Sequence, residues 1–281
     1  MDTTGQSEIL GMLREKFRID TSGYRPAFLS RRLDKRLAET ACGDYSEYIQ
    51  LLRSDGGAEL KELLHSLSVP VSMFFRDPLL FDLLAEQVLP DIVECNRQGQ
   101  QSRLRIWSAA CAAGQESASL AILVAELRHP QIEQIYTTLF GTDIDATLIA
   151  RAREGRYTAR DLEHVTLGRL RRWFVEREGL YVLHPEIRQR VRYVRHDLLD
   201  ERQHLPPDVL FSQFDMLACR NLLMYYGASA QETIFNKLDA ALKAGGYLLL
   251  GRSEYTPEAF RANYSLVLPR TGLYRKRSHR V

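Results

Sequence analysis

Residues 105–123 have the sequence Arg-Ile-Trp-Ser-Ala-Ala-Cys-Ala-Ala-Gly-Gln-Glu-Ser-Ala-Ser-Leu-Ala-Ile-Leu, and this stretch decides the fold. Its alternating apolar start predicts a strand. Small residues fill 108–114, and apolar residues then recur at helical spacing. Strand, tight turn and helix are typical of the first unit of a nucleotide-binding sheet, where small side chains let the backbone approach a ligand. An ordinary turn between a strand and a helix also favours small residues. With only one glycine present, this stretch leaves both interpretations open.

The composition is that of a globular protein with a sizeable core. The 281 residues suffice for one large and one small domain. No apolar run approaches the ~20 residues of a membrane span, and residues 1–5 lack a signal-peptide core. The net charge of +2 gives no reason to expect nucleic acid. The scattered cysteines, without a Cys-x-x-Cys pair, favour reduced thiols over a disulfide frame or a metal site. We therefore predict a cytoplasmic protein that does not insert into a membrane.

Residues 1–68 predict a small helical domain, because apolar residues recur there at helical spacing and no convincing strand is present. The helix expected over residues 24–40 carries a basic stripe beside its apolar face. A solvated helix face explains most charge runs of this kind. The alternative is a docking surface for an acidic partner, such as another helix. The stripe consists of Arg25, Arg31, Arg32, Lys35 and Arg36.

A linker over residues 69–78 joins this domain to the rest of the chain and contains Phe74, Phe75, Arg76 and Asp77. Adjacent aromatic residues are unusual in a linker. The run therefore suggests that the linker packs on the main domain and presents Arg76 to a site. The alternative is an apolar contact that fixes the start of the following helix, with Arg76 paired to its neighbour in solvent. Pro78 fits the first turn of that long apolar helix.

Strands and helices alternate from residue 104 onward, which predicts a mainly parallel sheet. The second strand, over 135–140, leads to Asp143, and a carboxylate at that point can accept from both hydroxyls of a ribose. Residues 157–190 interrupt the alternation and predict a small inserted α/β subdomain. We expect its strand over 179–183 to pair with residues 191–194. A closing hairpin is expected over 266–275.

Five segments of the chain resemble, in order, those of the CheR family, the S-adenosylmethionine-dependent methyltransferases of bacterial chemoreceptors. Together they span most of the chain, and five ordered segments are more specific than any one of them. The segments are Phe74–Asp77, Arg105–Glu116, Gly141–Asp145, Phe214–Tyr225 and Gly245–Glu254.

The resemblance implies a class I methyltransferase: a Rossmann-like, mainly parallel α/β sheet with an inserted subdomain, preceded by an all-α domain that recognises the receptor. The implied divisions are 1–68, a linker over 69–78 that contributes to the cofactor site, and a catalytic domain over 79–281. The implied reaction moves a methyl group from S-adenosylmethionine to glutamate side chains on cytoplasmic receptor helices. The products are methyl esters and S-adenosylhomocysteine.

The resemblance also assigns roles to single residues. Arg76 and Tyr225 would lie near the transferred methyl group, and the basic stripe at 25–36 would face the acidic methylation helix. The residues that would line the cofactor are Ser72, Arg76, Gly114, Glu116, Asp143, Asp197, Leu198, Arg220 and Asn221.

The implied chemistry suits these residue types. A glutamate carboxylate, with a pKa of ~4.3, is already a nucleophile at neutral pH, so no general base is needed. The protein has to align oxygen, methyl and sulfur and to exclude water. Arg76 is then an aligning residue, since an arginine that bound the carboxylate too tightly would stabilise the ground state without lowering the barrier.

The chain departs from the family pattern at two places. The family's Thr-Gly-Glu-Glu-Pro-Tyr turn is replaced by Ala-Gly-Gln-Glu-Ser-Ala over 113–118, and Pro70 stands where many members carry asparagine. The turn between residues 174 and 183 is short, so we expect no tether to a receptor's C-terminal peptide.

Other functions remain open from the residues alone. The altered turn motivates a regulatory module that binds S-adenosylmethionine or S-adenosylhomocysteine without turnover. A dehydrogenase on the same sheet would need a three-glycine fingerprint, which is absent. A nucleic-acid methyltransferase would favour aromatic residues interleaved with basic ones, which are also absent. No long apolar seam demands a dimer, so we predict a monomer.

Overall fold

The computed structural model describes residues 3–17, 20–67, 72–99, 103–127 and 135–278. By its internal contacts the chain forms two compact units. The first comprises Met1–Pro70 together with Tyr225–Gln231, and the second comprises Val71–Met224 together with Glu232–Val281.

The first unit is a bundle built by four helices around one apolar core. Pro26 occupies the first turn of its second helix, and Asp44 caps the third by accepting from the Glu47 N–H at 2.9 Å. Ile9, Leu13 and Leu63 are fully buried in the core. The helices are α1 Thr3–Phe17, α2 Pro26–Glu39, α3 Tyr45–Ser54 and α4 Ala58–Leu67.

A buried ion pair ties α2 to α4. Arg36 binds the Glu59 carboxylate with two parallel hydrogen bonds, of 2.9 Å from Nε and 2.6 Å from Nη2. The Tyr48 hydroxyl donates to the same carboxylate at 2.6 Å, and burial raises the pKa of Tyr48. A bidentate pair with low exposure is held far more firmly than a surface ion pair. Arg36 therefore has a structural task inside the bundle.

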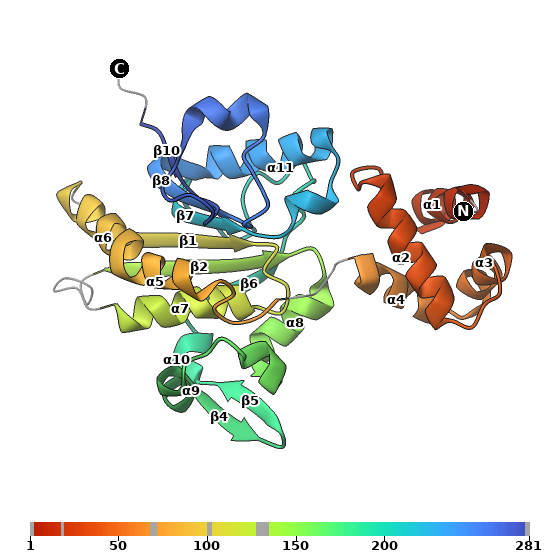
Figure 1. Ribbon diagram of the computed structural model, residues 1–281, viewed down its shortest axis with the longest axis horizontal. Coiled ribbons are helices and arrows are strands. Elements are labelled where there is room, and N and C mark those ends of the chain that lie inside the picture. The colour runs from red at the N-terminus through yellow and green to blue at the C-terminus, as the bar shows by residue number, and fades with distance from the viewer. Residues whose placement is uncertain (1–2, 18–19, 68–71, 100–102, 128–134, 279–281) are drawn as a thin grey trace. The chain divides into compact units, whose positions relative to one another are not determined.

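The second unit is organised around a seven-stranded sheet in the order β6-β2-β1-β7-β8-β10-β9 (Figure 1). The first five strands are parallel to their neighbours, and β10 and β9 run antiparallel. The predicted mainly parallel α/β sheet and its closing hairpin are thus confirmed. The strands are β1 Arg103–Ala109, β2 Tyr136–Asp143, β6 Val191–Arg195, β7 Phe214–Cys219, β8 Leu242–Leu250, β9 Tyr264–Leu266 and β10 Leu273–Lys276.

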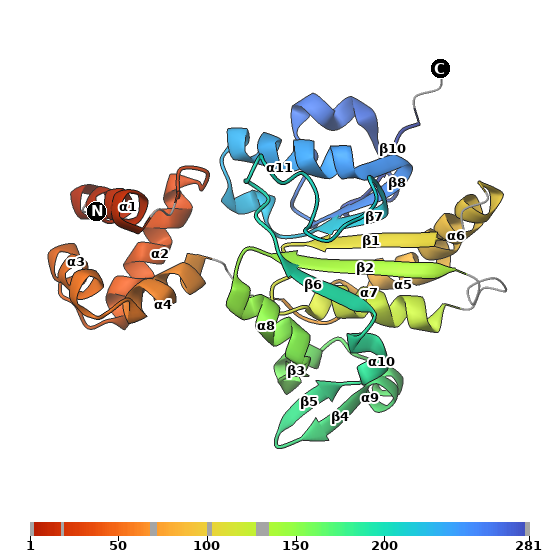
Figure 2. The same ribbon diagram turned by 180° about the vertical axis from the view of Figure 1, so that it is seen from behind.

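Helices cover this sheet, and Figures 1 and 2 show α6 and α7 beside its β1 and β2 strands. Trp107 and Phe214, on neighbouring strands, are completely buried, with ring centroids 5.5 Å apart. The helices are α5 Pro78–Leu83, α6 Leu89–Gln98, α7 Gln115–Glu126, α8 Ala146–Glu154 and α11 Ala228–Ala241, with short 3-10 helices at Leu223–Tyr225 and Glu258–Asn263.

The long helix expected after Pro78 contains a π-helical turn over Leu84–Val88, between α5 and α6. Pro90 lies at the start of α6. A proline has no N–H for the preceding turn and its ring crowds the carbonyl there, so the backbone widens locally. Within the described residues, no helix is long and apolar enough to cross a membrane.

The inserted subdomain has its own small sheet, in the order β3-β5-β4, which stands beside α9 and α10 in both ribbon views (Figures 1 and 2). Glu178 and Gly179 both have positive φ, of 52° and 73°, as a two-residue type I′ hairpin turn requires. The elements are β3 Arg156–Tyr157, the 3-10 helix Ala159–Leu162, α9 Leu167–Trp173, β4 Phe174–Arg177, β5 Leu180–Leu183 and α10 Pro185–Arg188.

The predicted pairing of residues 179–183 with 191–194 is wrong. The tight turn folds β5 back onto β4, and the other edge of β5 pairs with β3. The helix α10 then connects β5 to β6, which pairs in parallel with β2 in the main sheet.

Candidate functional site

The site lies at the carboxyl ends of β1 and β7. In the sheet, β2 and β6 lie on one side of β1 and β7 lies on the other, so the direction of strand addition reverses at β1. In open parallel sheets, ligands bind in the crevice at such a switch point. The segments that follow the two strands are residues 110–114 and Arg220 with Asn221. Sequence reasoning had selected both segments.

The turn after β1 has an unusual backbone. Ala110, Ala112 and Gly114 all have positive φ, of 54°, 50° and 87°. A Cβ atom at Gly114 would lie 2.7 Å from the Tyr193 hydroxyl and 2.8 Å from the Cβ of Ala152, so only glycine fits. Each alanine in this conformation costs about 1 kcal/mol or more. Such strain is retained where a backbone must present itself to a ligand, which favours the ligand-binding interpretation of the turn.

Asp143 holds this turn from the end of β2. Its carboxylate accepts from the Ala112 N–H at 2.9 Å and from the Asp145 N–H at 3.0 Å. The residue is 8% exposed, and burial raises the pKa of its carboxyl group. A carboxylate has about four acceptor positions. A further backbone hydrogen bond comes from Ile144, and the acceptor capacity that is left can serve a hydroxyl donor such as that of a ribose.

Arg220 is the centre of a buried charge cluster. Its side chain is 3% exposed and forms ion pairs with Asp77 and, at 3.5 Å, with Glu116. It also donates to the carbonyl of Arg76 at 3.2 Å. Glu116 accepts from the Ser108 hydroxyl at 2.8 Å. Burial raises the pKa of the Glu116 carboxyl group, and the positive charge of Arg220 opposes this shift.

This cluster joins the linker, β1, α7 and the end of β7 at one point. Within the described part of the chain, the Arg220 Nε atom is buried without a hydrogen-bond partner. A buried donor left unpaired costs about 1–3 kcal/mol. It is therefore a candidate donor to a bound ligand.

Asn221 directly follows Arg220, and its backbone lies in the left-handed region, with φ of 59°. Its N–H donates to the Glu254 carboxylate at 2.7 Å, and the N–H groups of Gly251 and Met224 donate to the same carboxylate at 2.7 and 3.2 Å. Glu254 is only 4% exposed. Sequence reasoning missed this role, although the residue ends one of the quoted segments. Glu254 fixes the loops after β7 and β8 against each other.

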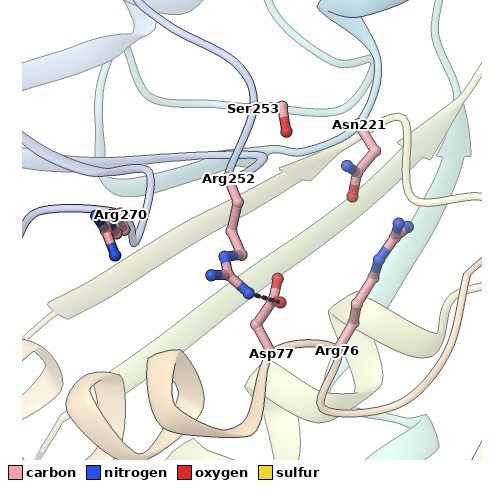
Figure 3. Close-up of a pocket in the computed structure, with 6 residues that line it drawn as sticks. All are labelled: Arg76, Asp77, Asn221, Arg252, Ser253 and Arg270. Atoms are coloured by element: carbon pink, nitrogen blue, oxygen red, sulfur yellow. Dashed lines mark ion pairs between the residues drawn. The ribbon is translucent and has the colours of Figure 1, made fainter.

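A pocket of about 410 Å³ opens beside this cluster (Figure 3). Figure 3 shows Arg76 directed toward Asn221, and Arg252 directed toward Asp77, with Nη1 of Arg252 3.9 Å from Oδ1 of Asp77. Arg76 and Asn221 were predicted site residues, and the structure brings them together. The described residues that line it are Arg76, Asp77, Asn221, Arg252, Ser253 and Arg270.

Two further predicted residues, Asp197 and Leu198, follow β6. The Asp197 carboxylate accepts from the Leu199 N–H at 2.8 Å, and Lys237 donates to the Asp197 carbonyl at 2.9 Å. Leu198 is 8% exposed. Ile144, which sequence reasoning did not select, is 43% exposed next to Asp143.

The linker is described from Ser72, which is half-buried. The position of Pro70, where the sequence departs from the family pattern, lies outside the described residues.

The altered turn has a local explanation. Gln115 is 3% exposed and donates to the Asp161 carboxylate at 3.0 Å. The carbonyl of Asp161 accepts from the Phe74 N–H of the linker at 2.9 Å. A glutamate at 115 would place two carboxylates together in a buried site. The neutral side chain of Gln115 therefore suits its contact with Asp161, whereas the charged glutamate of the family pattern does not.

Tyr225 belongs to the first unit. Its ring packs on Phe28 with a centroid distance of 4.9 Å, and its carbonyl accepts from the Arg25 N–H at 2.9 Å. Its predicted place near the methyl group stays a prediction.

The basic stripe is partly used within the first unit. Arg25 donates to the carbonyl of Tyr226 at 2.9 Å, and Arg31 donates to the carbonyl of Ala27 at 3.1 Å. Lys35 pairs with Glu39 at 3.5 Å on the exposed surface. The Arg32 guanidinium lies over the Phe28 ring at 5.3 Å, and Arg36 is the ion-pair partner of the buried Glu59.

Comparisons with known proteins show which family this chain belongs to. The family model described as "CheR methyltransferase, SAM binding domain" matches residues 70–267, and that described as "CheR methyltransferase, all-alpha domain" matches residues 7–68. A "Chemotaxis protein methyltransferase" of Listeria innocua is 30% identical over 84% of this chain and 84% of its own length. The "Chemotaxis protein methyltransferase 1" of Pseudomonas aeruginosa is 32% identical over 80% of this chain and 81% of its own length.

A larger relative shows the same similarity. An "Uncharacterized 104.1 kDa protein in hypE 3'region" of Rhodobacter capsulatus is 35% identical over 88% of this chain. The match spans only 25% of that protein's length.

Proposed function

Because this chain belongs to the CheR methyltransferase family, whose catalytic domain binds S-adenosylmethionine, we propose that it methylates glutamate side chains of a chemoreceptor. The single observation that carries the proposal is the switch-point site, where Asp143, the Arg220 cluster and Arg76 meet at one edge of the sheet. The family match extends through the helical domain as well. We further propose that the protein acts in the cytoplasm as a monomer.

The residues at the switch point fit S-adenosylmethionine. Asp143 keeps acceptor capacity for a ribose hydroxyl, and the strained turn that ends at Gly114 brings backbone close to the ligand. Leu198 and the exposed Ile144 offer apolar surface for the adenine. Glu116 and Arg220 present opposite charges, as an amino group and a carboxylate require. Ser72, Asp197 and Asn221 complete the proposed lining.

When bound, S-adenosylmethionine supplies a methyl group that its sulfonium makes reactive. The chain then has to place a glutamate oxygen in line with that methyl group. Arg76 extends into the pocket opposite Asn221, where its guanidinium can orient the carboxylate. No side chain has to take up a proton, because the glutamate is ionised at neutral pH. Tyr225 is the second proposed catalytic residue.

The exposed part of the basic stripe is the proposed surface for the receptor. Arg31, Arg32 and Lys35 lie on α2, and Lys35 is 58% exposed. Arg25 keeps its charge while its Nε is bound to a carbonyl. Arg36 is excluded from this surface because its charge is balanced by Glu59 within the bundle. Opposite charge on a receptor helix would speed and orient the encounter.

The test is transfer of labelled methyl groups from S-adenosylmethionine to the cytoplasmic fragment of a chemoreceptor. We expect wild-type protein to label the fragment, and Arg76→Ala to lower the rate by about a hundredfold, in the range for loss of a positioning contact. Arg97→Gln, which removes an exposed arginine of α6, is the matched control and should keep full activity. A fragment left unlabelled by a protein that binds S-adenosylhomocysteine would refute the proposal.

A further inference from the structure

Two arginines of the pocket in Figure 3 have no role so far. Arg252 follows β8, and Arg270 lies in the loop between β9 and β10. The Arg252 side chain is 61% exposed, and its ion pair with Asp77 is long, at 3.9 Å. Arg270 forms no ion pair with the described residues and is exposed. Both guanidinium groups are therefore accessible from solvent.

The pocket carries a surplus of positive charge. Among the described residues that line it, the only carboxylate is that of Asp77, which already forms an ion pair with the buried Arg220. Three arginines line the same space. A concave surface with one sign of charge concentrates the opposite ion. The planar fork of a guanidinium binds a carboxylate with two parallel hydrogen bonds, which makes an organic carboxylate a well-matched ligand.

Exposed apolar side chains lie close in sequence to the pocket lining. Leu79 is 84% exposed, Tyr255 is 70% exposed and Leu268 is 46% exposed. Each is two residues along the chain from a residue that lines the pocket. Large apolar side chains left in solvent beside a charged pocket are typical of a surface that binds another polypeptide. The ligand is thus an acidic polypeptide segment rather than a free anion.

We propose that Arg252 and Arg270 bind a carboxylate of the substrate protein other than the one that becomes methylated. The two arginines would then select acceptors that carry a second acidic side chain near the reacting glutamate. This inference rests on the proposed function, because it takes the methyl acceptor as the occupant of the pocket. Arg76 aligns the reacting carboxylate, and Arg252 and Arg270 determine specificity.

The experiment measures binding of two fluorescent helical peptides to the full chain saturated with S-adenosylhomocysteine. One peptide has a central glutamate flanked by glutamates, and the other has the same central glutamate flanked by glutamines. At an ionic strength of about 0.15 M, long-range attraction is largely screened. We expect wild-type protein to bind the acidic peptide about tenfold more tightly. Arg252→Gln/Arg270→Gln should lose most of this preference and keep only the part that the basic stripe on α2 supplies.

A matched control removes the same charge elsewhere in the second unit. Arg97→Gln/Arg261→Gln changes two exposed arginines outside the pocket and should keep the wild-type preference. Equal binding of both peptides by wild-type protein would overturn the inference, as would a preference that survives undiminished in Arg252→Gln/Arg270→Gln.

The alternative ligand is the carboxylate of the cofactor itself. If the pocket held it, Arg252→Gln/Arg270→Gln would weaken binding of S-adenosylhomocysteine in calorimetry, and the inference would fall. We expect that affinity to change less than twofold. If wild-type protein discriminates between the peptides but methylates neither, the pocket assignment holds and the proposed function is refuted.

Discussion

The buried carboxylate of Glu254 gives the sharpest structural prediction. Glu254→Gln keeps the shape of the side chain but replaces one acceptor oxygen with a donor NH₂. In the protein, one carboxylate oxygen accepts from Asn221 and Gly251, and the other accepts from Met224. The amide oxygen can keep the first two bonds, and the amide nitrogen then faces the Met224 N–H without an acceptor.

The expected cost follows from these contacts. One backbone donor left unpaired costs about 1–3 kcal/mol, and two bonds that lose their charge lose roughly 1 kcal/mol each. The free energy of unfolding should therefore fall by about 3–5 kcal/mol. For a unit of this size, that lowers Tm by about 6–20 °C. Affinity for S-adenosylhomocysteine should fall as well, because Asn221 is held by the same carboxylate.

Thermal unfolding followed by circular dichroism, with calorimetry of S-adenosylhomocysteine binding, tests this prediction. Glu258→Gln, which changes an exposed carboxylate four residues away, is the control and should leave Tm unaltered. A Glu254→Gln protein with wild-type Tm and wild-type affinity would show that the three backbone donors do not depend on this charge, and the reasoning would be refuted.

Three further predictions concern buried groups. Burial lowers the pKa of His196 to about 4, so the unfolded chain binds its proton first and stability is lost as pH falls from about 6.5 to 4. Urea titrations at pH 7 and pH 4 measure this loss. Between these two pH values the free energy of unfolding should fall by about 3 kcal/mol more in wild type than in His196→Leu. An equal fall in both proteins would contradict the prediction. Gln115→Glu should lower the free energy of unfolding, measured by urea titration, by about 2–4 kcal/mol. Adding Asp161→Asn should restore part of that loss, and no restoration would show that the two side chains do not interact. Arg36→Met should lower Tm by several degrees because it leaves Glu59 buried and unpaired, and an unchanged Tm would show that the pair is not structural.

The local parts of the site could be predicted from the sequence. The small-residue turn ending at Gly114 and the carboxylate of Asp143 both follow a strand directly, so strand patterning alone places them at one edge of the sheet. The parallel sheet follows from the alternation of strands and helices. Arg76 and Asn221 were selected through their resemblance to family segments, and the structure places both in one pocket.

The parts that sequence reasoning missed depend on contacts between distant segments. The pairing of β5 is decided by a two-residue turn at Glu178 and Gly179, whose geometry outweighs the apolar similarity of residues 191–194. The pocket brings Arg270 together with Arg76, residues far apart along the chain. Glu254 shows no periodic signal, because its role is to accept from backbone groups of its own loop and of the loop after β7. Such roles appear only when the loops are placed in space.

The most direct test of the central claim is the chemical nature of the bond that the enzyme forms. A methyl group on a glutamate carboxylate is an ester, whereas a methyl group on nitrogen or sulfur is not. Receptor fragment labelled by wild-type protein should release its label as volatile methanol in mild alkali, and Arg76→Ala should yield almost none. Label that survives alkali would contradict a carboxylate acceptor and, with it, the role that we assign to the arginine-lined site.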